Sequence, residues 1–198
     1  MKQEPTRTPI EEQCLPPRAD DGHKGTFGSV LVVGGCALGP VRMIGAPVLA
    51  GRAALRSGAG RVTLAVPEPI AEHALQMLPS ATGIALPLDA DGVLVRHQAA
   101  AAIDAALEKT DVVVVGPGLG DDPANEDLVL RLLAQDRVPV VVDADALNAL
   151  SRIDGAWEGV RAPCILTPHP GEWQRLAARP GRTPARLGGG GRALWFPG

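Results

Sequence analysis

The chain has 198 residues, of which 45% are hydrophobic and 21% are charged, and its formal net charge is −3. This is an ordinary globular composition in a chain long enough for one domain with a sizeable core, so a disordered protein is excluded. Nucleic-acid binding is disfavoured, because basic residues are not in excess and only three Trp and two Phe could stack on bases.

The sequence also bears on where the protein resides. No apolar run reaches the roughly 18 residues that a membrane-spanning helix requires, and the polar start lacks the apolar core of a secretory signal. Three cysteines far apart in the chain, Cys14, Cys36 and Cys164, make neither a disulfide framework nor a zinc-ligand set. We therefore expect a cytoplasmic protein with reduced thiols and no membrane segment.

In chain order, residues 1–22 are rich in proline and charge and predict a poorly ordered lead-in. From residue 23 on, short β-branched runs alternate with longer Ala- and Leu-rich stretches. Strands are predicted at 29–35, 61–66, 82–88, 111–116, 138–144 and 164–167, and helices at 43–58, 67–78, 97–110 and 124–135. This alternation predicts an α/β fold, a mostly parallel sheet with helices on both faces, whose ligands lie outside the carboxyl ends of the strands.

The first two candidate sites are glycine-rich segments that end a predicted strand. Gly34 and Gly35 close the first strand in the segment HKGTFGSVLVVGG, where their amides could approach a ligand or simply form tight turns. The glycine spacing matches neither a dinucleotide fingerprint nor a Walker loop. Further along, Gly116, Gly118 and Gly120 follow a four-valine strand in VVVVGPGLG. That loop could bind an anion or a ribose, or it could be a turn in which Asp121 or Asp122 caps the next helix.

Two further strand ends carry polar side chains. Asp143, Asp145 and Asn148 follow the strand of VVVDADALNAL, where carboxylates can bind hydroxyl groups, orient water or hold Mg²⁺. Alternatively, Asp145 caps a helix that begins at Ala146 and Asp143 shapes the turn. In CILTPHPGE, flanking prolines aim His169, which is otherwise a histidine satisfied within a rigid turn.

These four segments, together with GAPVLAGRAALRSGAGRVTLAVPE at residues 45–68, occur in an order that resembles the ADP-dependent NAD(P)H-hydrate dehydratases of the ribokinase-like superfamily. The resemblance covers residues 23–177. It implies a partial domain with a Rossmann-like three-layer sandwich that is incomplete at the C-terminus.

The resemblance implies a lyase of nicotinamide nucleotide repair. Members couple hydrolysis of ADP, or of ATP, to dehydration of the 6-hydroxy hydrates of NADH and NADPH, and Mg²⁺ assists. Phosphorylation of the hydroxyl group turns a poor leaving group into a good one, and the protein supplies positioning and charge stabilisation. Members tend to assemble, so the resemblance also allows a homo-oligomer, whereas neither nucleic acid nor membrane is an expected partner.

Carried over residue by residue, the resemblance implies that Ala46, Gly118 and His169 contact the hydrated dinucleotide. Asp143 and Asn148 belong to the same pocket, and Gly35 contributes backbone to it. No metal ligand is assigned among these residues.

Two segments of the family pattern do not occur in this sequence. The pattern continues with a Lys-Gly strand and a GTGD loop, which provides an anion hole and an aspartate base. Here the last lysine is Lys109, the last aspartate is Asp154, and the glycine run 188–191 leads into Arg192. No catalytic or nucleotide-phosphate-binding residue is therefore assigned, and we expect impaired catalysis.

Residues 178–198 consist mainly of Gly, Ala, Arg and Pro and predict a disordered tail. GC-rich codons encode these residue types, so we hypothesise a frameshift or a premature end near residue 178; the alternative is a natural Gly/Arg-rich tail. Two other functions remain open from sequence: a ribokinase-like small-molecule kinase of the hydroxymethyl-thiazole kinase type, and a non-catalytic vestigial nucleotide-binding protein. The TPHPGE and DADALN segments favour the dehydratase.

Overall fold

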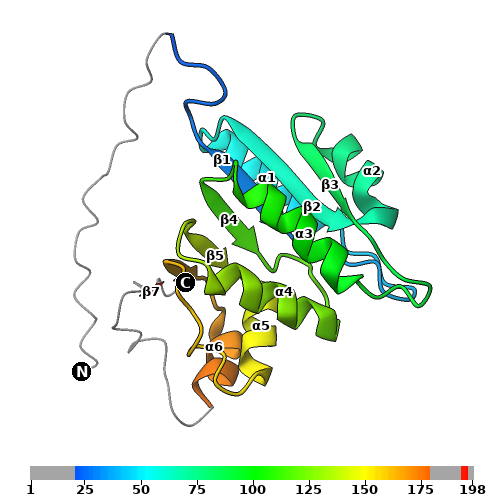
Figure 1. Ribbon diagram of the computed structural model, residues 1–198, viewed down its shortest axis with the longest axis vertical. Helices are drawn as coiled ribbons and strands as arrows, with labels where there is room; N and C mark the ends of the chain where they lie inside the picture. Colours follow the sequence, from blue (N-terminus) through cyan, green and yellow to red (C-terminus); the bar gives the residue numbers. More distant parts are fainter. Residues whose placement is uncertain (1–20, 179–192, 196–198) are drawn as a thin grey trace, which may run out of the picture.

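The computed structural model describes residues 21–178 and 193–195, in which strands and helices alternate along the chain (Figure 1). The strands are β1 (Ser29–Val33), β2 (Arg61–Pro67), β3 (Thr82–Leu86), β4 (Val112–Val115), β5 (Val140–Val142), β6 (Cys164–Leu166) and β7 (Ala193–Trp195). The helices are α1 (Gly45–Arg56), α2 (Glu68–Met77), α3 (Arg96–Leu107), α4 (Pro123–Ala134), α5 (Ala144–Arg152) and α6 (Pro170–Ala177).

All described strands join one parallel sheet in the order β3-β2-β1-β4-β5-β6-β7. The chain builds outwards from β1 in one direction and then from β4 in the other. This is the doubly wound arrangement, and it confirms the predicted α/β fold with a parallel sheet. The order changes direction between β1 and β4, so the helices that follow these two strands, α1 and α4, cover opposite faces of the sheet.

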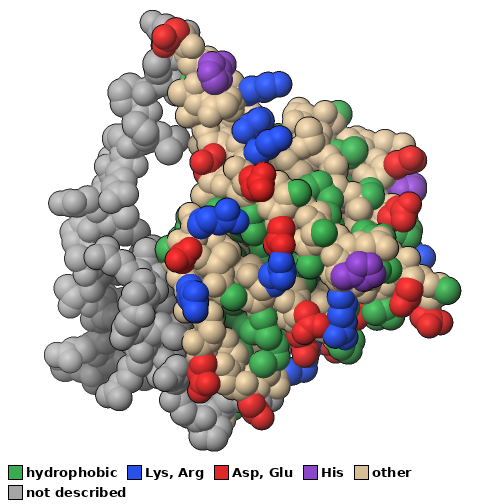
Figure 2. Space-filling model, in the orientation of Figure 1, with side chains coloured by type: hydrophobic (Ala, Val, Ile, Leu, Met, Phe, Trp, Pro, Cys, Tyr) green, Lys and Arg blue, Asp and Glu red, His purple; other side chains and the backbone are tan. Residues whose placement is uncertain are grey.

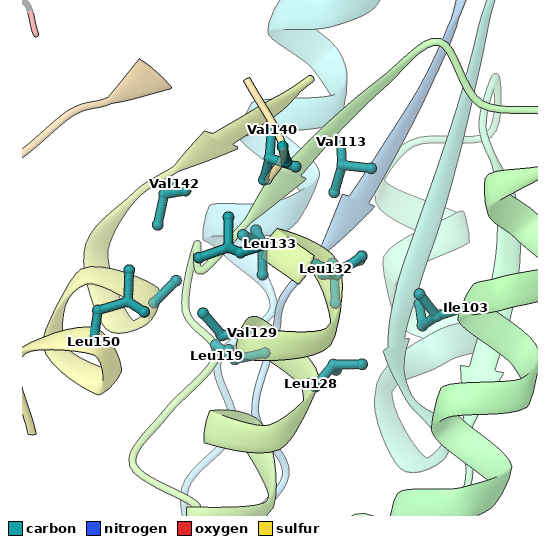
Figure 3. Close-up of a cluster of buried hydrophobic side chains, with 14 of the residues drawn as sticks. Ile103, Val113, Leu119, Leu128, Val129, Leu132, Leu133, Val140, Val142 and Leu150 are labelled. Carbon is teal, nitrogen blue, oxygen red and sulfur yellow. The ribbon is translucent and has the colours of Figure 1, made fainter. Parts of the chain in front are cut away.

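Helices cover both faces of the sheet. Helices α1 and α2 pack with alternate residues of β1 and β2, including Val32, Leu64 and Val66. Helices α3 to α6 pack on the opposite face, where Leu132 and Leu133 of α4 lie against Val140 of β5 (Figure 3). Burial of each such side chain contributes about 1.5–3 kcal/mol, and together they form a three-layer sandwich.

The alternation along β5 and β6 shows that cover is unequal on the two faces. Val140, Val142, Cys164 and Leu166 are buried on the α4 side, whereas Val141 and Ile165 between them are only half-buried. The sequence pattern could not reveal this inequality, because a continuous apolar run predicts burial on both faces.

The predicted elements are found within a few residues of their expected bounds. The differences lie at the ends: β5 is shorter than 138–144 because Pro139 has no N–H to donate, and Asp143 already leads into α5. Asp122 caps α4, as one of the two interpretations of the GPGLG segment expected, with its carboxylate accepting from Ala124 N at 2.8 Å. Within the predicted tail, Ala193–Trp195 form β7 beside β6, and the segment between it and α6 lies outside the described residues, as do residues 1–20 of the predicted lead-in.

Ion pairs join α3 to α4 on their exposed surface, where oppositely charged side chains lie next to one another (Figure 2). Arg96 pairs with Asp127 at 2.5 Å, and Arg131 binds the carboxylate of Asp104 through two nitrogens. The hydrogen bond from Arg131 lowers the pKa of Asp104 below its usual value. Because these side chains remain half-exposed, the pairs add little stability.

Cys164 is expected to be unreactive while the protein is folded. Its side chain is buried on β6, its thiol donates to Ala162 O at 3.1 Å, and burial raises its pKa to about 11. Iodoacetamide should therefore leave Cys164 unmodified in mildly alkaline buffer and label it fully in urea, as read by mass spectrometry of the peptide. Rapid labelling of the folded protein would contradict this prediction.

The same pKa has a consequence for stability. An unfolded cysteine loses its proton near pH 9.0, whereas folded Cys164 keeps its proton up to about pH 11. Between these values the unfolded chain binds fewer protons than the folded one, so this thiol makes stability fall as the pH rises.

Among the described residues, none of the helices has both the length and the apolar character that crossing a membrane requires.

Candidate functional site

The loops after β1 and β4 meet at the point where the strand order changes direction. Gly35 N donates to Pro117 O at 3.0 Å, and Gly116 N donates to Val33 O at 3.0 Å. In doubly wound sheets, the crevice outside the carboxyl ends at this point is where ligands bind. The two glycine-bearing segments that the sequence singled out therefore form one structure.

Two glycines are required for this close approach. A Cβ atom on Gly34 would lie 2.3 Å from Pro117 O, and one on Gly116 would lie 1.9 Å from Asp143 O. Gly116 also has a φ of +115°, a backbone conformation that other residues rarely adopt. Glycine at these positions is thus dictated by backbone packing, which is independent of any ligand.

Gly35, Ala46 and Gly118 gather around the loop that leads into α1. A Cβ on Gly118 would lie 3.4 Å from the Cβ of Ala46 and 3.3 Å from that of Met43, and a Cβ on Gly35 would lie 3.1 Å from Met43 O. Ala46 is exposed at the start of α1, whose N-cap residue makes no side-chain hydrogen bond. Pro47 has no N–H and Val48 N donates to Ile44 O at 3.4 Å, so the amides of Gly45 and Ala46 are the ones that this turn offers to an anionic or hydroxyl-bearing ligand.

Leu119 fixes the GPGLG loop to the hydrophobic core. Its side chain is 3% exposed and packs in the core beside Val129 of α4 (Figure 3). From the same helix, the amide of Asn125 donates to Leu119 O at 2.9 Å. The loop is thus held rigidly between the core and α4, which preorganises the glycine backbone.

Asp143 and Asp145 support the site, and neither carboxylate caps α5. The N-cap residue is Asp143, but its carboxylate accepts from Thr167 Oγ1 at 2.7 Å and so ties the end of β5 to that of β6. Asp145 accepts from Gly120 N at 2.8 Å. The capping alternative for Asp145 is therefore wrong: α5 begins at Ala144, two residues before the expected start at Ala146, and the Asp145 carboxylate fixes the GPGLG loop.

Between the two aspartates, Ala144 has a φ of +47°, and it is the one non-glycine residue at positive φ in the described part of the chain. A left-handed conformation costs about 1–2 kcal/mol for an alanine. We expect Ala144→Gly to raise the free energy of unfolding by about 1 kcal/mol, because relief of strain exceeds the added chain entropy of glycine. Urea unfolding measures this change.

The matched control is Ala101→Gly, at an exposed position within α3. In an ordinary helical conformation, the same substitution should lower the free energy of unfolding by about 1 kcal/mol. Equal destabilisation by both variants would show that Ala144 is unstrained.

Asn148 lies one turn along α5. Its Oδ1 accepts from Arg175 Nη2 at 2.8 Å, and its Nδ2 lies 3.4 Å from Asp145 Oδ1. It borders a cavity of about 400 Å³ between α5, α6 and the GPGLG loop, lined by Gly120, Asp121, Asp145, Asn148, Ser151, Arg152 and Arg175. Asn148 thus lines this cavity, and hydrogen bonds connect it through Asp145 to Gly120 of the GPGLG loop.

His169 is the N-cap residue of α6. Its Nδ1 accepts from Gly171 N at 3.0 Å and from Glu172 N at 3.4 Å, and its Nε2 lies 3.3 Å from Glu172 Oε1. The backbone of its own turn therefore satisfies Nδ1, while 62% of the side chain is exposed. The sequence identified His169, but it could not show that the backbone of the adjacent helix occupies Nδ1.

The described carboxylates do not fit a metal site held by protein alone. No group of three or more His, Cys, Asp or Glu side chains capable of holding an ion occurs within residues 21–178. Asp143 and Asp145 each already accept a hydrogen bond. Mg²⁺ that reaches such a site is held largely by phosphate oxygens and water.

Sequence reasoning did not identify Asn125, Glu172 and Arg175 as supports of this site. Asn125 donates to the backbone of Leu119, Glu172 accepts from the backbone of His169, and Arg175 donates to the side chain of Asn148. For Glu172 a signal existed, because a glutamate three residues after an N-cap is a capping-box pattern. The other two depend on contacts between elements that the sequence pattern does not place together.

Comparison with known proteins decides the family. The sequence profile of the NAD(P)H-hydrate dehydratases matches residues 30–188, which is most of the chain. The chain belongs to the NAD(P)H-hydrate dehydratase family. The match contains all the segments on which the resemblance rested except the start of the first, and it favours the dehydratase over the thiazole-type kinase.

Curated relatives carry the same description. The chain is 44% identical over 176 residues to the bifunctional NAD(P)H-hydrate repair enzyme Nnr of Moorella thermoacetica, covering 87% of this chain and 31% of that protein. It is 37% identical over 172 residues to the ADP-dependent (S)-NAD(P)H-hydrate dehydratase of Xanthomonas campestris, covering 87% of this chain and 55% of that enzyme. The chain thus spans about half, or less, of the length of these relatives.

Solved structures agree with the fold. The ADP/ATP-dependent NAD(P)H-hydrate dehydratase of Bacillus subtilis, co-crystallised with ATP/Mg²⁺, superposes with a TM-score of 0.62 at 35% identity, covering 83% of this chain and 52% of that one. A ribokinase-like superfamily protein from Enterococcus faecalis gives 0.65 at 26% identity, covering 83% and 53%. The ribokinase-like fold that the sequence predicted is confirmed.

Proposed function

We propose that the protein acts in ADP-dependent dehydration of the 6-hydroxy hydrates of NADH and NADPH, as a lyase of nicotinamide nucleotide repair. One observation carries the proposal: in a chain of the dehydratase family, Gly35, Ala46 and Gly118 converge at the carboxyl edge of the sheet where its strand order changes direction. ADP, or ATP, is the proposed co-substrate, in keeping with the names of the relatives and with the nucleotide present in the Bacillus structure.

The proposed reaction balances in two steps. The hydroxyl oxygen of the hydrate attacks the terminal phosphoryl group of ADP and releases its proton to water, which gives AMP and a phosphate ester. The ester then loses phosphate from one ring carbon and a proton from the next, which restores the double bond of the reduced nicotinamide. Phosphoryl transfer requires mainly alignment and charge stabilisation from the protein.

The described residues contribute binding and orientation to this reaction. The amide of Ala46 at the start of α1 and that of Gly118 are suited to the pyrophosphate and ribose groups of a dinucleotide, whereas the amides of Gly35, Gly116 and Gly120 hold the loops together. The small side chain of Ala46 leaves the approach to Gly118 open. Asp143, held by Thr167, and His169 at the start of α6 border the same edge of the sheet.

The proposal is tested by incubating the purified protein with NADPH hydrate, ADP and Mg²⁺ and following the return of NADPH absorbance and the release of AMP. In parallel, binding of the hydrate is measured by calorimetry, and a thiazole alcohol with ATP is offered as the substrate of the competing kinase. We expect saturable hydrate binding and no phosphorylation of the thiazole. Failure to bind the hydrate, or phosphorylation of the thiazole alcohol, would contradict the proposal.

A further inference from the structure

Met43, which no motif of the sequence singled out, lies where the segments of the candidate site meet. Its backbone pairs with that of Cys36: Cys36 N donates to Met43 O at 3.0 Å, and Met43 N donates to Cys36 O at 2.9 Å. This antiparallel bridge ties the segment that follows β1 to the segment that precedes α1. The bridge uses backbone atoms alone, so it holds Met43 in place whatever side chain the residue carries.

The side chain of Met43 extends along the GPGLG loop. The position of a Cβ on Gly118 is 3.3 Å from Met43 Cβ, and the position of a Cβ on Gly120 is 3.4 Å from Met43 Cε. The two ends of the side chain thus lie beside different glycines of one loop. Met43 is nevertheless only half-buried, so part of its surface faces solvent.

Met43 and Ala46 flank the same glycine. A Cβ on Gly118 would lie 3.3 Å from Met43 Cβ and 3.4 Å from Ala46 Cβ, so both side chains are as close to Gly118 as packing allows. Ala46 ends at its Cβ, whereas Met43 continues for three more atoms. A ligand that contacts Ala46 and Gly118 therefore lies within reach of the Met43 thioether.

Methionine has the chemistry that such a site requires. Small-molecule sites combine a few placed polar groups with apolar side chains that cover the rest of the ligand. Here the amides of Gly45 and Ala46 are the polar groups at the start of α1, and Met43 adds an apolar surface next to them. A thioether is flexible and polarizable, and it packs favourably against rings.

We propose that Met43 is a substrate-contact residue: its thioether packs against a ring of the hydrated dinucleotide when that ligand lies over Ala46 and Gly118. The inference rests on the proposed function, because it takes the hydrated dinucleotide to be the ligand of this site. It adds an apolar contact that contributes to the affinity for the substrate.

The contact is tested on the unmodified chain by NMR of methionine methyl groups. The sequence contains three methionines, Met1, Met43 and Met77, so labelling their methyl groups with carbon-13 gives three signals, and Met43→Leu identifies that of Met43 by its loss. On addition of NADPH hydrate we expect the Met43 signal to shift and to show nuclear Overhauser contacts with ring protons of the ligand. The signal of Met77, which is 44% exposed on α2, should not move.

Affinity provides an independent readout by calorimetry. Met43→Ala removes the thioether, and we expect the dissociation constant for NADPH hydrate to rise about tenfold, because apolar contact with the ligand is lost. Met43→Leu keeps a similar volume and should raise the dissociation constant only about threefold. Met77→Ala is the matched control and should leave affinity unchanged. Thermal unfolding verifies that each variant is folded.

The outcomes separate this inference from the function on which it rests. If the unmodified protein binds the hydrate to saturation and the Met43 signal neither shifts nor shows a contact with a ligand ring, the contact is overturned and the proposed function stands. Equal affinities for folded M43A and M77A would overturn it as well. If the unmodified protein does not bind the hydrate, the proposed function is overturned, and the contact inferred for Met43 falls with it.

Discussion

Gly116→Ala is expected to lower the free energy of unfolding by about 4 kcal/mol. The added methyl group would lie 1.9 Å from Asp143 O and 2.8 Å from the Cβ of Ala146, and neither the strand end nor the buried start of α5 can move aside cheaply. Overpacking of this kind costs about 1–3 kcal/mol, and a non-glycine residue held in a sparsely populated backbone region costs about 1–3 kcal/mol more.

Urea unfolding followed by circular dichroism measures the effect, with Gly159→Ala as the matched control. A methyl group added at Gly159 would meet no heavy atom within 4 Å, and Gly159 has no positive φ, so the same substitution should change stability by less than about 0.5 kcal/mol. A Gly116→Ala protein as stable as the control would show that the loops after β4 and β5 are not packed as closely as described.

Ala46→Leu is expected to weaken binding of NADPH hydrate about thirtyfold, which corresponds to about 2 kcal/mol. Ala46 is exposed, and its Cβ is 3.4 Å from the point where Gly118 would carry a side chain, so an isobutyl group there covers the glycine loop. Leucine suits a helix nearly as well as alanine, so the fold should be unaffected. Calorimetry with the hydrate gives the affinity, and thermal unfolding checks the fold.

Ala53→Leu provides the comparison, because Ala53 is exposed on the same helix about two turns further on. It should leave both affinity and stability close to those of the unmodified protein. Equal affinities for the Ala46→Leu and Ala53→Leu proteins would place the dinucleotide elsewhere on the molecule.

Most of the fold could be predicted because its signals are local. Four consecutive valines before Gly116 indicate a buried strand, and the Ala-rich segment before Thr110 indicates a helix, whatever the rest of the chain does. The ends of helices and strands were predicted less accurately than their middles. The start of α5 is an example, since Ala144 joins the helix at a positive φ that no propensity would favour.

The candidate site could be predicted in part. Gly35, Ala46 and Gly118 were named from the family resemblance, and the structure brings them together around Met43. Asn148 was named on the same grounds and stays a prediction; its Oδ1 accepts from Arg175 of α6, and it lines a cavity beside the GPGLG loop. A residue number in a motif does not say which way a helical side chain points, because that depends on where the helix begins.

Hydrophobic periodicity, the positions of glycines and the order of motifs are properties of the sequence itself. They suffice to predict the α/β class, the order of the elements and the family. Which loops meet, which carboxylates support backbone and which nitrogens of His169 are occupied follow from the folded arrangement alone. Gly120 and Asp145, 25 residues apart, show why: their hydrogen bond of 2.8 Å exists only because β4 and β5 lie side by side. Contacts of this kind are set by the pairing of strands, which no local pattern records.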